Sequence, residues 1–339
     1  MKIKKVNMAL QGGGAHGAFT WGVLDKLLED HRIAFEGISA TSAGAMNAAV
    51  VAQGLHQGGN DEARELLDKF WRRMSGYGKI FSPVRETPLD VLLNLDVTHS
   101  TSYFIFELFS HFLSPYQFNP ANFNPVKDIL SEMIDFEQFS EIKCVKLFIC
   151  ATNVRTGKIK IFQDGEISLQ AILASSALPH LFQAVQIGND FFWDGGYLGN
   201  PAIYPLIYET NVRDIVIVHI NPIARHKIPQ DTSEILNRVN EISFNSSLLR
   251  ELRVIHFISN LLDKGWIKDE FKDQVKKMNI HSIRADKMME EYSVASKLNP
   301  NWAFLTKLRD KGREVAEEWL DKNYHAIGKG STINFDEFV

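Results

Sequence analysis

Apolar positions in the first part of the chain alternate between short continuous runs and helical repeats. Residues 5–11 form a short apolar run that predicts a buried strand, and residues 18–31 then repeat apolar side chains at helical spacing. Residues 35–55 show the same order again, with a short strand, a turn centred on Ser42 and a helix of small residues. The pattern therefore predicts two consecutive strand, turn and helix units of an α/β core.

The middle of the chain predicts a hairpin, a helix and another buried strand. Residues 145–162 alternate apolar and polar positions on both sides of a glycine turn, which indicates a hairpin. Residues 168–182 are expected to form a helix that Pro179 stops. The uniformly apolar run at residues 214–222 is typical of a central parallel strand covered on both faces, and the α/β core is expected to end near it.

Two further segments have patterns of their own. Residues 77–125 contain many aromatic residues and scattered prolines, with no lysine after Lys79, which favours an insertion or a lid that contacts acyl chains. Residues 231–263 and 301–321 repeat apolar positions at helical spacing. Residues 226–339 are therefore expected to form a mainly helical C-terminal extension.

Composition and charge narrow the class of protein. Hydrophobic residues make up 45% and charged residues 23%, as in ordinary globular proteins. A net charge of -4 without a long basic run argues against a nucleic-acid partner. The chain shows neither a signal peptide nor an apolar stretch that could span a bilayer. Cys144 and Cys150 share one face of a predicted strand, which argues against a disulfide between them. We expect a cytoplasmic protein, peripheral to a membrane where it meets one.

The first candidate site is the glycine-rich segment from Gly12 to Gly17, between the first strand and the first helix. Glycines lack a Cβ, so their backbone N–H groups can approach an anion beside the positive N-terminus of a helix. The segment also matches G-x-G-x-x-G, and Glu36 lies where a dinucleotide site has its ribose-binding acid. A dinucleotide-binding dehydrogenase is therefore an alternative at this point.

The second and third candidate sites also follow strands. The segment Ala40-Thr41-Ser42-Ala43-Gly44 has the strand, turn and helix context of a nucleophile elbow, with Ala40 in place of the first glycine of G-x-S-x-G. The turn Asp194-Gly195-Gly196 follows the strand-like FFW run, and its glycines allow a backbone path that aims a carboxylate out of the sheet. The three motifs in this order favour a serine hydrolase over a dehydrogenase.

With these motifs the sequence resembles the patatin-like phospholipase family over residues 6–220. The resemblance implies a three-layer α/β/α fold with a mostly parallel central sheet, in which residues 1–225 form the catalytic domain. By that resemblance Ser42 is the nucleophile, Asp194 is the base, and the N–H groups of Gly12, Gly13 and Gly14 form the oxyanion hole. The supporting residues of the motifs are His16, Gly17, Gly44, Gly195 and Gly196.

His16 stands where the family commonly has arginine or lysine. A histidine is only partly charged near neutral pH, and the simpler interpretation is a loop histidine that forms a hydrogen bond. We therefore expect a weaker preference for phospholipid over neutral ester than an arginine would give.

The resemblance implies a lipid acyl hydrolase of the phospholipase A, lysophospholipase or carboxylester hydrolase type. Its partner would be a lipid or another acyl ester, met through transient contact with a membrane surface. A serine hydroxyl needs a neighbouring base, and Phe191, Phe192 and Trp193 predict a partly apolar setting that makes Asp194 more basic. Neither a cofactor nor a metal is expected.

Two alternatives keep the same fold. In a conventional triad, His219 at the end of the run at residues 214–222 would act between Ser42 and Asp194, and His180 is a second candidate. A catalytically silent lipid-binding or membrane-associated scaffold would bind lipid without turnover. The sequence predicts neither the lipid class nor the oligomeric state.

Overall fold

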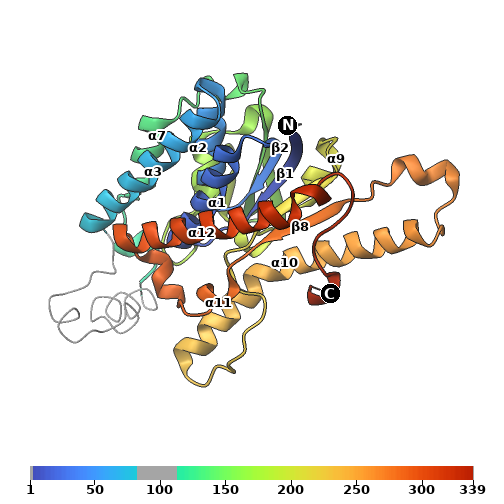
Figure 1. Ribbon diagram of the computed structural model, residues 1–339. Helices are drawn as coiled ribbons and strands as arrows, with labels where there is room; N and C mark the ends of the chain where they lie inside the picture. Colours follow the sequence, from blue (N-terminus) through green and yellow to red (C-terminus); the bar gives the residue numbers. More distant parts are fainter. Residues whose placement is uncertain (1–2, 82–112, 339) are drawn as a thin grey trace.

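The computed structural model describes residues 3–81 and 113–338 (Figure 1). Most of the predicted aromatic insertion, residues 82–112, lies outside the described residues. On its flanks, Tyr116, Phe118 and Phe123 are exposed.

A single mixed sheet organises the structure. Its eight strands are β1 (Lys4–Leu10), β2 (Ile33–Ala40), β3 (Lys146–Asn153), β4 (Ile159–Gln163), β5 (Val185–Ile187), β6 (Asp190–Asp194), β7 (Asp214–Val218) and β8 (Asn279–Ile283). The order is β5-β6-β3-β2-β1-β7-β8, with β4 also paired to β3. Strands β8, β7, β1, β2 and β3 run parallel, so their carboxyl ends meet at one edge of the sheet.

Helices cover both faces of this sheet. The α-helices are α1 (Gly17–Asp30), α2 (Ala43–Gln57), α3 (Asn60–Phe81), α6 (Pro115–Phe118), α7 (Pro125–Met133), α8 (Leu169–Ser175), α9 (Tyr204–Glu209), α10 (Thr232–Asp263), α11 (Asp286–Met289) and α12 (Trp302–Asn323). Short 3-10 helices are η1 (Gly14–His16), η3 (Phe139–Glu141), η4 (Asp164–Glu166), η5 (Gly195–Tyr197), η6 (Asp269–Gln274), η7 (Val294–Leu298), η8 (Tyr324–Ala326) and η9 (Phe335–Glu337).

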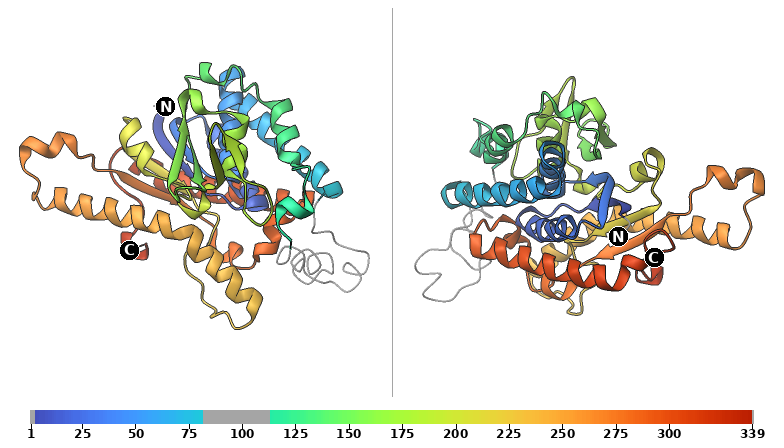
Figure 2. Two further views of the ribbon diagram at one scale, coloured as in Figure 1. Left: turned by 180° about the vertical axis from the view of Figure 1, so that it is seen from behind. Right: turned by 45° about the horizontal axis from the view of Figure 1, so that its top comes forward.

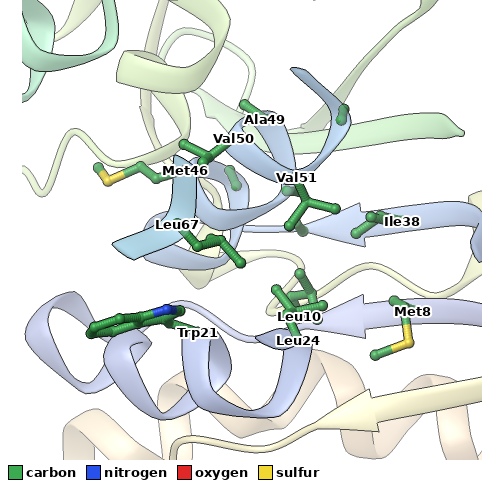
Figure 3. Close-up of a cluster of buried hydrophobic side chains, with 14 of the residues drawn as sticks. Met8, Leu10, Trp21, Leu24, Ile38, Met46, Ala49, Val50, Val51 and Leu67 are labelled. Atoms are coloured by element: carbon green, nitrogen blue, oxygen red, sulfur yellow. The ribbon is translucent and has the colours of Figure 1, made fainter. Parts of the chain in front are cut away.

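The alternation of side chains along the strands explains the two helical layers. On β1, Met8 and Leu10 point into a core shared with α1, α2, α3 and α12 (Figure 3). Ala9 points to the other face, into a core that includes residues of α9 and α10. Strands buried on both faces are uniformly apolar, as the sequence predicts for β7. The structure confirms the expected α/β fold with a mostly parallel sheet.

The hairpin predicted at residues 145–162 is formed by β3 and β4, which pair antiparallel. The helix predicted at residues 168–182 is shorter than expected, because α8 ends at Ser175. The carbonyl of Ala177 instead accepts a hydrogen bond of 2.9 Å from the backbone N–H of Asp194. The chain therefore leaves the helix before Pro179, in order to pair with the end of β6.

The C-terminal part is mainly helical, as the periodicity of α10 and α12 predicts, but it also completes the sheet. Strand β8 pairs parallel with β7, so the sheet does not end near residue 222. Helix α12 packs on α1, where a Cβ on Gly22 would collide with the backbone of Arg309. Figure 2 shows α10 extending well past the sheet edge. The division into residues 1–225 and 226–339 stays a prediction.

Candidate active site

The three predicted motifs meet at the carboxyl edge of the parallel strands. The glycine-rich loop follows β1 and Ser42 follows β2, which is the neighbouring parallel strand. Asp194 ends β6, whose antiparallel pairing with β3 places Asp194 opposite Ala151. The fold therefore brings residues that are far apart in sequence to one end of the sheet.

Ser42 occupies a strained turn between β2 and α2. Its φ of 56° and ψ of -124° lie in a region that L residues rarely adopt. Its backbone N–H donates to Oγ of Ser175 over 2.9 Å, which holds the turn in place. Gly44 must be small, because a Cβ there would lie 2.5 Å from the carbonyl oxygen of Leu10. The geometry is that of a nucleophile elbow.

The glycine-rich loop passes directly beside Ser42. A Cβ on Gly12 would lie 2.6 Å from the Cβ of Ser42. The N–H of Gly12 donates to Oδ1 of Asn200 over 2.6 Å, so this donor is already in use. Within residues 3–81 and 113–338, the N–H groups of Gly13 and Gly14 donate to no partner. These two groups remain as donors for an anion beside Ser42.

Asp194 is completely buried at the start of η5. Its Oδ1 accepts a hydrogen bond of 2.7 Å from the N–H of Gly196, while Oδ2 has no hydrogen-bond partner. Burial raises the pKa of the Asp194 carboxyl to about 7, although the N–H of Gly196, the Ser42 hydroxyl and Lys297 each lower it. The Ser42 hydroxyl therefore lies near enough to interact with the carboxylate, without a hydrogen bond of ordinary geometry.

His16 is buried at the end of η1 and serves the loop as a hydrogen-bonding residue. Its Nε2 lies 2.7 Å from Oγ of Ser296, and its ring packs against Tyr292 and Phe304. Burial and the nearby charge of Lys297 lower the pKa of His16 to about 3. The ring is therefore neutral at physiological pH.

The structure does not bring either candidate histidine to Ser42 and Asp194. His219 is buried beside Phe338, and neither ring nitrogen has a hydrogen-bond partner. Burial lowers the pKa of His219 to about 3, with a further contribution from Arg284. His180 is exposed on the segment after α8. A conventional triad through His219 therefore finds no support in the geometry.

Glu36 does not serve a nucleotide site. Its carboxylate accepts hydrogen bonds from the N–H groups of Asn211 and Val212, at 3.1 and 2.7 Å. These residues precede β7, so Glu36 lies toward the amino ends of the parallel strands, away from the glycine-rich loop. The acid has a structural role in joining β2 to the turn before β7.

Several residues of the site were not predicted from the sequence. Asn200, Ser175 and Lys297 come from three separate segments, and each contacts a motif by a side chain or backbone atom. No local pattern marks them, since each acts on a partner more than a hundred positions away. The only signal near Asn200 is its place shortly after Asp194-Gly195-Gly196.

Two features are absent from the described part of the chain. Residues 3–81 and 113–338 contain no group of three histidine, cysteine, aspartate or glutamate side chains that could hold a metal ion. None of the helices in those ranges combines the length and apolar character needed to cross a membrane.

A serine on a strand-to-helix elbow, beside a glycine-rich loop and a buried aspartate turn, defines an α/β protein of the nucleophile-elbow class. Within that class the chain belongs to the patatin-like phospholipase family, whose model matches residues 8–207, more than half of the chain.

Solved structures with detectable similarity are distant. VipD from Legionella pneumophila is 15% identical, over 92% of this chain and 67% of its own, with a TM-score of 0.36. The complex of ExoU with SpcU, from the type III secretion system of Pseudomonas aeruginosa, matches at 16% identity over 94% of this chain, with a TM-score of 0.35. This chain covers 52% of the matched Pseudomonas chain. A comparison with curated proteins gives no match.

Proposed function

We propose that the protein is a serine lipid acyl hydrolase of the phospholipase A, lysophospholipase or carboxylester hydrolase type. Membership of the patatin-like phospholipase family supports this activity. The observation that carries the proposal is the pairing of a strained serine, 8% exposed, with a wholly buried aspartate whose Oδ2 is unpartnered. A carboxylate in that setting is a stronger base than one in water.

In the proposed mechanism, Oγ of Ser42 attacks the carbonyl carbon of the ester while Asp194 takes the hydroxyl proton. The N–H groups of Gly13 and Gly14 stabilise the negative charge on the carbonyl oxygen. Collapse of the tetrahedral intermediate breaks the ester C–O bond, and Asp194 returns the proton to the leaving alcohol. A water molecule, deprotonated by Asp194, then attacks the acyl carbon; the bond to Oγ of Ser42 breaks, Asp194 returns the proton to Oγ, and the acyl group leaves as a free acid.

Gly12 has a supporting role in this proposal. Because its N–H donates to Oδ1 of Asn200, and Nδ2 of Asn221 donates to its carbonyl over 3.0 Å, both polar groups of Gly12 are fixed. Such preorganised loops need no rearrangement when charge develops in the transition state. Asn200 and Asn221 therefore hold the loop that presents Gly13 and Gly14.

Hydrolysis of a short-chain p-nitrophenyl ester and of a phospholipid panel tests the proposal. We expect Ser42→Ala and Asp194→Asn each to lower kcat on the order of a thousandfold or more, because nucleophile and base act as one unit. Matched controls are Ser131→Ala and Asp190→Asn, since both side chains belong to exposed residues away from the elbow. Circular dichroism establishes that each variant is folded.

Turnover that persists in Ser42→Ala contradicts the proposal. A wild-type protein that binds vesicles but hydrolyses none of the substrates would instead support a silent lipid-binding scaffold. Phospholipids and neutral esters in one assay also show which class of ester the site accepts.

A further inference from the structure

A C-terminal segment covers the glycine-rich loop that lies beside Ser42. In η7, Oγ of Ser296 contacts the ring of His16 at 2.7 Å. A Cβ on Gly14 would collide with the carbonyl oxygen of Lys297, so the two backbones are in direct contact. This segment lies beyond residues 8–207, which the family model matches.

The side chain of Lys297 points toward the site. Its Nζ donates to Oδ1 of Asn221 over 2.7 Å and to Oδ1 of Asn240 over 3.4 Å. Asn221 in turn donates to the carbonyl of Gly12 over 3.0 Å. The ammonium group is thereby fixed to the loop by way of Asn221.

Lys297 also reaches the turn that carries Asp194. Its Nζ lies 5.6 Å from the centre of the Phe244 ring, on α10. Phe244 lies directly against Gly196, where no Cβ would fit, and the N–H of Gly196 donates to Oδ1 of Asp194. The ammonium is therefore linked to the glycine-rich loop by way of Asn221 and to the turn that carries Asp194 by way of Phe244.

Among residues 3–81 and 113–338, Lys297 is the cationic group that interacts with Asp194. Lys297 interacts with Glu241, Asp194 and Arg225, and burial lowers the pKa of Lys297 to about 8, so it is charged at neutral pH. The other groups that interact with Asp194 are the backbone N–H of Gly196 and the side chains of Ser42, Cys150 and Tyr197, none of them cationic.

His16 adds no second positive charge. Its pKa of about 3 keeps the ring neutral, and the charge of Lys297 contributes to that low value. The loop therefore depends on the C-terminal segment for its cation.

We propose that Lys297 is a positioning residue of the site, whose ammonium group stabilises the ionised carboxylate of Asp194, the form that accepts the proton of Ser42. This inference rests on the proposed function, because Asp194 accepts the proton of Ser42 only if the protein is a serine hydrolase. Its physical basis is that an opposite charge in a poorly solvated site favours the ionised form of a carboxyl group.

Three variants of the full chain test this role. Lys297→Met removes the charge, Lys297→Gln removes it but keeps a hydrogen-bond donor, and Lys297→Arg retains it. Lys276→Met is the matched control, because Nζ of Lys276 also binds two oxygens, the carbonyls of Ile207 and Thr210. Titration of the Asp194 carboxyl carbon by 13C NMR, assigned with Asp194→Asn, reads the charge state without any need for turnover.

We expect the Asp194 pKa to rise in Lys297→Met and Lys297→Gln and to stay at the wild-type value in Lys297→Arg and Lys276→Met. In parallel, kcat/KM for a neutral ester at pH 6 should fall roughly three- to tenfold in the first two variants. At pH 9 they should match the wild type within about twofold, because the lysine itself is then largely neutral.

An unchanged Asp194 titration in Lys297→Met and Lys297→Gln overturns the inference, as does an equal shift in Lys297→Arg, which would indicate altered packing. A loss confined to KM for phosphate-bearing lipids, with an unchanged titration, also overturns it and assigns the lysine to headgroup binding instead. Failure of the proposed function appears separately, as absent wild-type turnover or as turnover that survives Ser42→Ala.

Discussion

Asp194 shows how strongly the behaviour of one residue depends on its surroundings. A carboxyl group in water is almost fully ionised at pH 7, but burial raises the pKa of Asp194 to about 7. The sequence predicted the direction of this shift from the aromatic residues that precede Asp194. The turn that holds Asp194 also packs on Phe244 of α10, which lies against Gly196 and which no local pattern connects to the aspartate.

This raised pKa has a consequence for stability. The folded protein keeps the proton of Asp194 at pH values where the unfolded chain, with a pKa near 3.8, has lost it. The contribution of Asp194 to the free energy of unfolding therefore falls as pH rises from about 4 to 7. We expect Asp194→Asn to be more stable than the wild type at pH 8, by about 4 kcal/mol, and nearly equal to it at pH 4.

Urea unfolding at the two pH values measures this difference directly. The exposed Asp190→Asn variant, on the same strand, should show no such dependence on pH. A wild type that is as stable as Asp194→Asn at pH 8 would contradict a costly buried carboxylate.

The glycine-rich loop acts as an element, because its shape is fixed by contacts on several sides. We expect Gly12→Ala to lower kcat on the order of a hundredfold, comparable with the loss of an oxyanion donor. The reason is that the new Cβ would lie 2.6 Å from Cβ of Ser42 and 2.8 Å from the carbonyl oxygen of Thr41, so the loop must move. Ester hydrolysis and near-UV circular dichroism check the result.

Gly165→Ala is a suitable control for that variant. A Cβ on Gly165 would meet no atom within 4 Å, and its φ is not in the left-handed region. Full activity in Gly12→Ala would show that the contact between the loop and Ser42 is looser than the structure indicates.

Elements with strong local signals were predicted, and those defined by tertiary partners were not. The apolar run of β7 and the turn at Ser42 can be recognised from neighbouring residues. Strand β8 has no such signal, because His281 and Ser282 interrupt its apolar positions, and His281 meets its partner Asp214, at 3.1 Å, only in the fold. The positions of Asn200 and Lys297 in the site likewise depend on the complete fold.

At the scale of the whole molecule, the C-terminal part supports both the sheet and the site. Strand β8 pairs with β7, and α12 covers α1 with apolar side chains. Those that are buried include Leu305, Leu308, Trp319 and Leu320. At about 2 kcal/mol each, these four side chains contribute about 8 kcal/mol, comparable with the net stability of a domain.

We therefore expect a chain ending at residue 225 to be insoluble or unfolded, although it retains Ser42, Asp194 and the glycine-rich loop. Solubility and cooperative thermal unfolding, measured beside the full chain, check this expectation. A soluble fragment with a cooperative transition would show instead that residues 1–225 fold independently of the C-terminal extension.

The contact between η7 and the glycine-rich loop also sets the order in which the site can form during protein synthesis. Ser42 and Asp194 leave the ribosome well before Ser296 and Lys297, which cover the loop. A nascent chain consequently carries the proposed nucleophile and base without the segment that contacts the loop and brings Lys297 to it. The proposed site therefore becomes complete only when most of the chain has been translated.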